Sequence, residues 1–450
     1  MAATAAGVRT MEGARPGALP LPELLEGGEP VLLKGLVRDW SLVAAGRESS
    51  QAAIAHLLEH SNGRPLPYSW GPADTAGRPF YDDSYTRLNT EARRGTLEQV
   101  LGEIQAHLED ARPPTHYVAS VPVDSVLPGL RACNDLDFAA HGVEAPPAIW
   151  IGNRTTASCH YDAPDNIACC AVGRRRFTLF PPEQIHNLYP GPLEPTPGGQ
   201  AVSVVDFDAP DLARFPRFAQ ALAHARSVEL DPGDALFIPS MWWHHVQGLS
   251  PFNVLVNYWW NSVPAWVPTP MHALHHALWA IRDRPEREKQ AWREVFEYYV
   301  FGPAERAGEH LPEEARGVLG PFDEAAARRM RAWLIARLNR WAQPCPERPR
   351  APLRRRIAAR PRNGRSPSHI TANFSGEQDT WHKAASGASS SPAAAPRAGS
   401  PRAHSPTSSA TCSKSPWSSR SRSARWAWAS PRSRPSAPST GCWESTSASS

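Results

Sequence analysis

Residues 231–246 read Asp-Pro-Gly-Asp-Ala-Leu-Phe-Ile-Pro-Ser-Met-Trp-Trp-His-His-Val, and this stretch decides the predicted fold. Its first four residues predict a turn, because proline presets one backbone angle and glycine readily adopts the left-handed conformation. The apolar run 235–238 then predicts a short buried strand, which ends before Pro239. A short strand enclosed by turn residues is typical of an antiparallel barrel or jelly roll.

Similar short runs of strand-forming residues recur on both sides of this stretch, each bounded by Pro, Gly or Asp. They are 116–119, 148–152, 176–180, 227–230, 235–238 and 253–260. Many short strands at this spacing predict a protein that is mainly β with helices, built on a double-stranded β-helix (jelly-roll or cupin) core at 116–262. Residues 208–225 are expected to form a helical insertion in this core.

The segments around the predicted barrel differ from it in pattern. Residues 1–20 are rich in Ala, Gly and Pro and are expected to be flexible, and 21–115 predict N-terminal α/β elements, with helices at 52–60 and 96–111. Residues 263–343 predict a C-terminal helical region. Its segment 322–341 carries large apolar side chains at helical spacing, which would pack either on the barrel of the same chain or in a homodimer interface.

The net charge of +4 hides two parts of opposite sign. Residues 344–450 contain 17 Lys and Arg against 4 Asp and Glu, so the first 343 residues are acidic. This tail is rich in Ser, Pro, Ala and Arg, and we expect a low-complexity, disordered segment. The positive net charge of the chain therefore reflects this tail and is weak evidence for nucleic-acid binding. We expect a nucleic-acid partner only if tRNA is a substrate.

The cysteine pattern and the hydropathy of the chain indicate its cellular compartment. The seven cysteines are scattered and form no CxxC pair, which fits a reducing environment. The N-terminus shows neither a basic region followed by an apolar one, as in a signal peptide, nor a run of about 18 apolar residues, as in a membrane span. The expectation is a cytoplasmic protein with no membrane partner.

Three metal-ligating side chains are distributed between two predicted strand regions. His160 and Asp162 lie two positions apart in His-Tyr-Asp, so on a strand both would point to one face. His244 would lie opposite them if its strand is an antiparallel neighbour. Two imidazoles and one carboxylate are the set with which non-haem Fe(II) oxygenases hold iron on one face. Taken alone, His-x-Asp is a weak signal, and a surface tripeptide is the alternative.

A basic strand follows the first two of these residues. In Gly-Arg-Arg-Arg-Phe-Thr-Leu-Phe at 173–180, Arg174 and Arg176 would face one side and Arg175 the other. An inward arginine could bind the carboxylate of a dianionic co-substrate through two parallel hydrogen bonds. A solvated basic strand face is the alternative.

Together these motifs resemble a known family. Residues 149–261 are similar to the JmjC or cupin-like (Cupin_8) 2-oxoglutarate oxygenases, and in particular to the asparaginyl hydroxylase that inhibits hypoxia-inducible factor. The residues that carry the resemblance are HYD at 160–162, GRRRFTLFPPEQIHNLYP at 173–190, VDFDAPDLARFPRF at 205–218, DPGDALFIPSMWWHHV at 231–246 and NVLVNYWW at 253–260. The resemblance extends from about residue 20 to 342.

The resemblance implies a role for several single residues. The implied iron ligands are His160, Asp162 and His244, the last preferred to His245 because the family's ligand lies two positions before Val246. The implied contacts to the co-substrate are Arg175, Asn166, Tyr117 and Asn257, and Trp259 occupies the matching aromatic position as the catalytic candidate. The alternatives stay open: Asn257 could satisfy barrel backbone groups, Trp259 could be core, and Tyr117 could be structural.

Two positions depart from the family pattern. The cation for the co-substrate is often lysine but is Arg175 here, and the threonine expected three residues before the first histidine ligand is Ala157. Both changes affect the surroundings of the co-substrate rather than the metal ligands.

The implied activity is that of a 2-oxoglutarate-dependent dioxygenase (hydroxylase) that uses Fe(II), with 2-oxoglutarate as co-substrate. Such an enzyme releases succinate and CO2 while it hydroxylates a protein side chain, a small molecule or a tRNA base. Hydroxylation and demethylation are not distinguished by sequence. A different metal-dependent cupin and a non-catalytic cupin-fold binding protein are the competing hypotheses.

Overall fold

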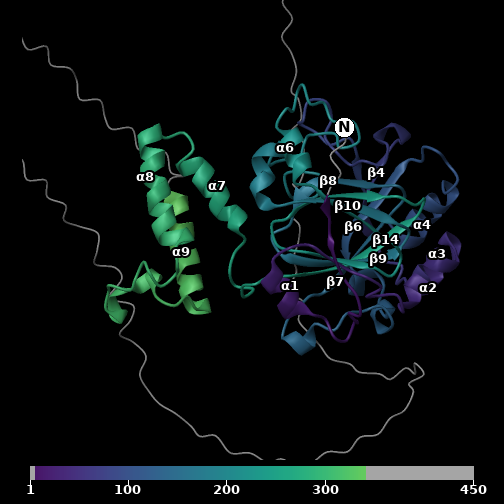
Figure 1. The fold of residues 1–450 in the computed structure, drawn as a ribbon, viewed down its shortest axis with the longest axis horizontal. Helices are drawn as coiled ribbons and strands as arrows, with labels where there is room; N and C mark the ends of the chain where they lie inside the picture. Colours follow the sequence, from purple (N-terminus) through teal and green to yellow (C-terminus); the bar gives the residue numbers. More distant parts are fainter. Residues whose placement is uncertain (1–5, 341–450) are drawn as a thin grey trace, which may run out of the picture. The chain divides into compact units, whose positions relative to one another are not determined.

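The computed structural model of this chain describes residues 6–340 (Figure 1). Predictions for the first five residues and for the low-complexity tail at 344–450 fall outside this part. Within it, the chain forms two β-sheets, helices that follow the N-terminal strands, and further helices after the last strand. The predicted fold class, a double-stranded β-helix core with N-terminal α/β elements and a C-terminal helical region, is confirmed for the described residues.

The smaller sheet carries two of the three predicted metal ligands. Its strands, in spatial order, are β1 (Ala6–Gly7), β11 (Arg226–Leu230), β10 (Arg175–Phe180), β13 (Trp243–Gly248) and β8 (Thr156–Tyr161). Apart from the parallel β1–β11 pair, the strands run antiparallel.

The larger sheet packs against the smaller one. Its strands, in spatial order, are β2 (Arg9–Met11), β3 (Val31–Leu33), β12 (Ala235–Ile238), β9 (Asp165–Val172), β14 (Asn253–Trp260), β7 (Pro147–Gly152), β6 (Thr115–Pro122), β4 (Leu66–Gly71) and β5 (Glu91–Gly95). Strand β9 is buried at every position, because one face meets the other sheet and the other face meets helices.

A hydrophobic core lies between the two sheets. Leu236 and Ile238 of β12 and Cys170 of β9 meet Phe177 and Leu179 of β10 in one buried cluster. The alternation of side chains along each strand directs these residues inward and their neighbours outward. The inner faces of β10 and β13 therefore lie inside the barrel, where a site can be enclosed.

Helices cover the outer face of the larger sheet (Figure 1). They are α1 (Leu21–Gly27), α2 (Ser41–Glu48), α3 (Ser50–Glu59), α4 (Leu97–Ala106) and the short α5 (Val123–Val126). Helix α4 begins at a capping box between Thr96 and Gln99 and buries Leu97, Val100, Leu101 and Ile104. This is the apolar spacing from which a helix at 96–111 is predicted, although the helix ends earlier, at Ala106.

The outer face of the smaller sheet is covered by the predicted helical insertion, which proves shorter than expected. Only α6 (Phe218–Ala223) is helical there, and the prediction is wrong for 208–217. The side chain of Asp211 accepts hydrogen bonds from the backbone N–H groups of Ala213 and Arg214, and Pro210 and Pro216 flank this turn. Such local hydrogen bonds compete with the helix.

Short helical turns connect the larger elements. They are η1 (Ala73–Thr75), η2 (Leu130–Ala132), η3 (Ala139–His141), η4 (Pro182–Asn187), η6 (Glu313–Ala315) and η7 (Gly317–Leu319). Of these, η4 packs close to α6 and the aromatic residues beneath it.

The C-terminal helical region contains α7 (Pro270–Ala280), α8 (Glu286–Phe296), the π-helical turn η5 (Glu297–Phe301) and α9 (Glu324–Arg340). Large apolar side chains are exposed here, among them Trp279, Phe301 and Ile335. A homodimer interface made by these helices stays a prediction. Within residues 6–340, no helix is both long and apolar enough to cross a membrane.

The turn that precedes β12 gives a direct test of the fold. Gly233 has φ +106°, and a Cβ atom there would lie 3.0 Å from the Cα of Arg38. Gly233→Ala should lower the free energy of unfolding by about 1–3 kcal/mol. Gly63 also has a positive φ, of +68°, but a Cβ atom at that position would meet open space, so Gly63→Ala is the matched control with a smaller cost. If urea unfolding showed the same loss of unfolding free energy for Gly233→Ala and Gly63→Ala, the crowding at Gly233 would be contradicted.

Candidate metal centre

His160 and His244 lie directly opposite each other on neighbouring strands. Strand β13 runs antiparallel to β8, and its register pairs His244 with His160 and Trp243 with Tyr161. The two imidazole centroids are 4.4 Å apart. Tyr161 and Trp243 point to the other face of the sheet, where their rings pack edge to face. His160 and Tyr161 therefore point to opposite faces of the strand, as the sequence predicts.

Asp162 completes the group from the residue just after β8. Its backbone carbonyl accepts a hydrogen bond from the N–H of Met241, which ties the end of β8 to the loop before β13. Its Oδ2 lies 3.6 Å from Nε2 of His244. One ligand atom from each of His160, Asp162 and His244 lies within 4.8 Å of the others. The three residues thus converge as a two-histidine, one-carboxylate set.

Backbone carbonyls orient both imidazoles. Nδ1 of His160 lies 2.8 Å from the carbonyl oxygen of Ser158, and Nδ1 of His244 lies 3.0 Å from that of Trp242. A carbonyl can only accept, so each Nδ1 donates its proton and each Nε2 keeps a free lone pair. This is how proteins usually orient histidines for a metal. The donor set fits a non-haem Fe(II) site with open coordination positions.

The surroundings of His244 favour the neutral imidazole. The side chain is buried, and burial together with the nearby His160 lowers the pKa of His244 to about 4, although Asp162 acts in the opposite direction. A metal binds the neutral ring, so His244 is ready to bind without first losing a proton.

His245 points away from this group. It pairs with Thr178 of β10, and its ring stacks on Phe207 with centroids 4.5 Å apart. Both ring nitrogens are buried and have no hydrogen-bond partner among the described residues. Its position on the opposite face of β13 makes His244, and not His245, the histidine that faces His160 and Asp162.

Arg175 lies inside the barrel. The side chain is only 3% exposed, and its Nε and Nη2 have no hydrogen-bond partner among residues 6–340. The two adjacent arginines differ, because Arg174 (just before β10) and Arg176 are exposed and both pair with Glu229. A buried cation without a partner is costly, so an anion that enters the barrel would be strongly favoured at Arg175.

Tyr117 lies close to this guanidinium. Burial raises the pKa of Tyr117 to about 12, although the positive charge of Arg175 acts to lower it. Burial lowers the pKa of Arg175, while Tyr117 and Cys170 act against this. The tyrosine therefore stays a neutral hydroxyl, able to donate or accept a hydrogen bond beside the cation.

The remaining predicted residues are on β9 and β14. Asn257 accepts a hydrogen bond of 2.7 Å from Nε1 of Trp150 and donates one of 3.4 Å to Asn166. Trp259 pairs with Asn166 across the two strands and packs edge to face on Trp150. Nε1 of Trp259 is buried and has no partner among the described residues. Asn166, Asn257 and Trp259 thus form one polar and aromatic group.

Two residues of this neighbourhood were missed from sequence. Trp150 links the group, because it contacts Tyr117, Asn257 and Trp259. Its only sequence signal is its place between Ile149 and Ile151, which makes it face away from the helix-covered side of β7. Arg78 donates hydrogen bonds to Ser158 and Val205, and no motif marks it.

Comparison with known proteins agrees with this geometry. A family model described as the cupin-like domain matches residues 18–265, more than half of the chain. HSPB1-associated protein 1 of Homo sapiens is 41% identical over 115 residues, which are 25% of this chain and 22% of that protein. Lysine-specific demethylase JMJ31 of Arabidopsis thaliana is 36% identical over 202 residues, 41% of this chain and 35% of that protein.

The name of a third relative refers to tRNA. The tRNA wybutosine-synthesizing protein 5 of Danio rerio is 37% identical over 106 residues, which are 24% of this chain and 29% of that protein. The chain therefore covers between 22% and 35% of the length of these three relatives. The finer resemblance to the asparaginyl hydroxylase stays a prediction.

The orientation of the two adjacent histidines predicts a difference between two variants. His244→Ala should bind one Fe(II) fewer per chain than the wild type, because it removes a ligand that faces His160 and Asp162. His245→Phe should keep the metal, because that ring only stacks on Phe207. Iron content after anaerobic loading and dialysis measures both. Loss of iron in His245→Phe and retention in His244→Ala would reverse the assignment.

Proposed function

The chain belongs to the cupin-like domain family, and from this premise we propose that it is an Fe(II)- and 2-oxoglutarate-dependent oxygenase. The observation that carries the proposal is the convergence of His160, Asp162 and His244 in a barrel that also holds Arg175, whose Nε and Nη2 have no partner in the described part of the chain. The first three residues suit a metal with open positions, and the fourth suits the far carboxylate of a dianion.

In this proposal Nε2 of His160, Nε2 of His244 and the carboxylate of Asp162 hold Fe(II). When bound, iron and 2-oxoglutarate supply the oxidative chemistry, with succinate and CO2 as products. The protein's part is orientation. The carbonyls of Ser158 and Trp242 keep the ring protons on Nδ1, and the carboxylate offsets part of the metal charge.

Strand geometry supports Arg175 as the anchor for the distal carboxylate of 2-oxoglutarate. On β10, Leu179 pairs with His244 and Arg175 pairs with Gly248, so the arginine lies four residues along the strand from the metal ligands. Four residues of a strand span roughly 13 Å. The extended side chain of Arg175 and the bound 2-oxoglutarate would together bridge this distance. The neutral Tyr117 hydroxyl would add a hydrogen bond to the same carboxylate.

Asn166, Asn257 and Trp259 would line the barrel between the co-substrate and the substrate. Asn257 is held by Trp150 and Asn166, so it is positioned before any ligand binds. Nε1 of Trp259 is buried without a partner among residues 6–340, so it could donate a hydrogen bond to a ligand in the barrel. We assign Asn166 and Asn257 to co-substrate binding, and Trp259 to the substrate side as the catalytic aromatic residue.

For the substrate we propose a side chain of a protein or peptide, with a small molecule or a tRNA base as alternatives. The relatives carry names that point to a lysine-specific demethylase and to tRNA wybutosine synthesis, so the family fold alone does not select among these classes. Hydroxylation is proposed over demethylation. A cytoplasmic location and a homodimer stay predictions.

A direct test is the release of succinate by the full-length chain. The protein is loaded with Fe(II) without air, then given 2-oxoglutarate, oxygen and candidate peptides. We expect succinate in the wild type and none above background in His160→Ala, with both proteins folded by circular dichroism. Wild-type protein that binds Fe(II) but forms no succinate with any substrate would favour a non-catalytic cupin-fold binding protein. Protein that binds no metal would contradict the proposal altogether.

The co-substrate anchor predicts a matched pair of variants on one strand. Arg175→Ala should raise the KM for 2-oxoglutarate about tenfold or more, since it removes a charged hydrogen-bond donor, while the iron content stays that of the wild type. Arg176→Ala removes an exposed arginine one position away and should change neither value. A KM that responds equally to both substitutions would move the carboxylate site elsewhere.

A further inference from the structure

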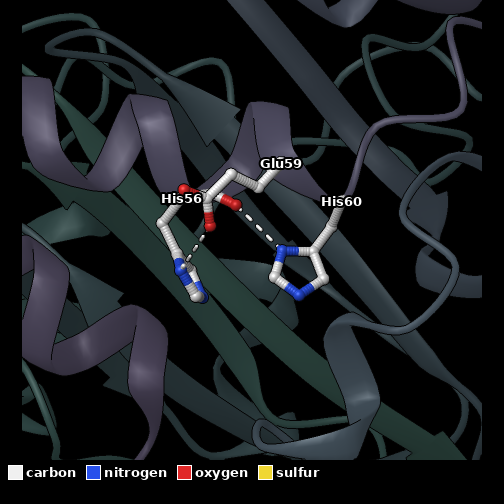
Figure 2. A group of neighbouring side chains, drawn as sticks. All are labelled: His56, Glu59 and His60. Atoms are coloured by element: carbon white, nitrogen blue, oxygen red, sulfur yellow. Dashed lines mark hydrogen bonds and ion pairs between the residues drawn. The ribbon is translucent and has the colours of Figure 1, made fainter. Parts of the chain in front are cut away.

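A second group of metal-ligating side chains lies at the C-terminal end of helix α3. His56, Glu59 and His60 are spaced three and four residues apart in His-Leu-Leu-Glu-His, so they share one face of the helix. Figure 2 shows the three side chains turned toward one another. One ligand atom from each lies within 4.8 Å of the others. No function described above uses these residues.

Hydrogen bonds fix the tautomer of His60, whereas that of His56 depends on whether Ser41 donates or accepts. Nδ1 of His60 lies 2.9 Å from the carbonyl oxygen of His56, and since a carbonyl only accepts, Nε2 of His60 keeps its lone pair. Nε2 of His56 lies 3.0 Å from Oγ of Ser41, and its Nδ1 lies 3.9 Å from Oε2 of Glu59. A cation at this group would bind Nδ1 of His56, with Nε2 donating to Ser41, and would bind Nε2 of His60 once that ring turns, because its Nδ1 now faces the group and donates to a carbonyl.

A buried network holds His56 in place. Asn134 is only 3% exposed, and its Nδ2 donates to Oγ of Ser41 and to the carbonyl of Leu130. Its Oδ1 accepts from the N–H of Leu42. Ser41 Oγ, in turn, contacts His56. A histidine ligand is usually supported by such a partner on its second ring nitrogen.

The electrostatics of the helix end also suit a cation. The carbonyl end of a helix carries partial negative charge, and His60 is the residue that caps α3. The carboxylate of Glu59 adds a full negative charge, and its side chain is 71% exposed and can adjust its position. Two imidazoles and one carboxylate, with a water as fourth ligand, are a donor set that Zn²⁺ accepts.

We propose that His56, Glu59 and His60 form a second divalent transition-metal site, separate from the one at His160, Asp162 and His244, with Zn²⁺ as its preferred occupant. The site lies on the outer layer of helices and is open to solvent at Glu59. Its occupation would brace the end of α3 through Asn134 and Ser41 against the segment that contains Leu130.

The chain contains a matched comparison for this group. His224 caps α6 in the same way, with Nδ1 2.9 Å from the carbonyl of Gln220. At the positions that correspond to His56 and Glu59, however, α6 has Gln220 and Ala223. If a histidine at a helix end were enough to bind zinc, His224 would bind it as well as His60.

The test is the zinc content of the full-length chain after equilibrium dialysis against Zn²⁺, starting from metal-free protein. Other histidines and cysteines of the chain could also bind zinc. The zinc content of each variant is therefore compared with that of the wild type. We expect His60→Ala to bind one zinc fewer than the wild type and Glu59→Gln to bind that zinc more weakly. His224→Ala should match the wild type.

The zinc content of a double variant tests whether this site is separate from the first metal centre. His160→Ala and His60→Ala should each lose one zinc, and the double variant should lose two, with circular dichroism confirming that all variants fold. Zinc contents equal to the wild type in both His60→Ala and Glu59→Gln would overturn the proposal. So would a double variant that loses no more zinc than His160→Ala alone.

Discussion

The pairing of β13 with β8 is the interaction on which the candidate site depends. This register places His244 directly opposite His160 and leaves Asp162 at the end of the same strand. Side chains alternate along a strand, so a slip of one residue would turn His244 outward and bring His245 to the inner face. The same slip would move the apolar side chains of β13 out of the core. Burial of the barrel interior and assembly of the metal ligands therefore select one and the same register.

The second constraint is a buried charge for which residues 6–340 provide no partner. Arg175 lies on the inner face of β10 beside Phe177 and Leu179, where a neutral side chain would be more stable. Its unpaired donors are explained if an anion completes the site, as in the proposed function. The forked guanidinium of Arg175 can offer two parallel hydrogen bonds from one direction. The position of the co-substrate would then be set by Arg175 and by the metal together.

The sequence predicts much of the barrel, because most of its strands are short runs between turn residues. It predicts that His160 and Asp162 share a face, and that Arg175 faces away from Arg174 and Arg176. The predicted strand runs omit β8, β9 and β13. In β9 the continuous apolar run at 167–172 shows no alternation, because both faces of that strand are buried. The sequence also overestimates the helix at 208–225, where aspartate turns prevail, and overlooks Trp150. That residue acquires its role only through contacts between strands distant in sequence.

The most direct test of the account is a crystal structure of the full-length chain with Mn(II) in place of Fe(II) and with 2-oxoglutarate. We expect an anomalous-scattering peak bound by Nε2 of His160, the carboxylate of Asp162 and Nε2 of His244. We also expect the distal carboxylate of 2-oxoglutarate to lie against Arg175. A barrel without metal at these three residues, or a co-substrate whose distal carboxylate lies away from Arg175, would contradict the account.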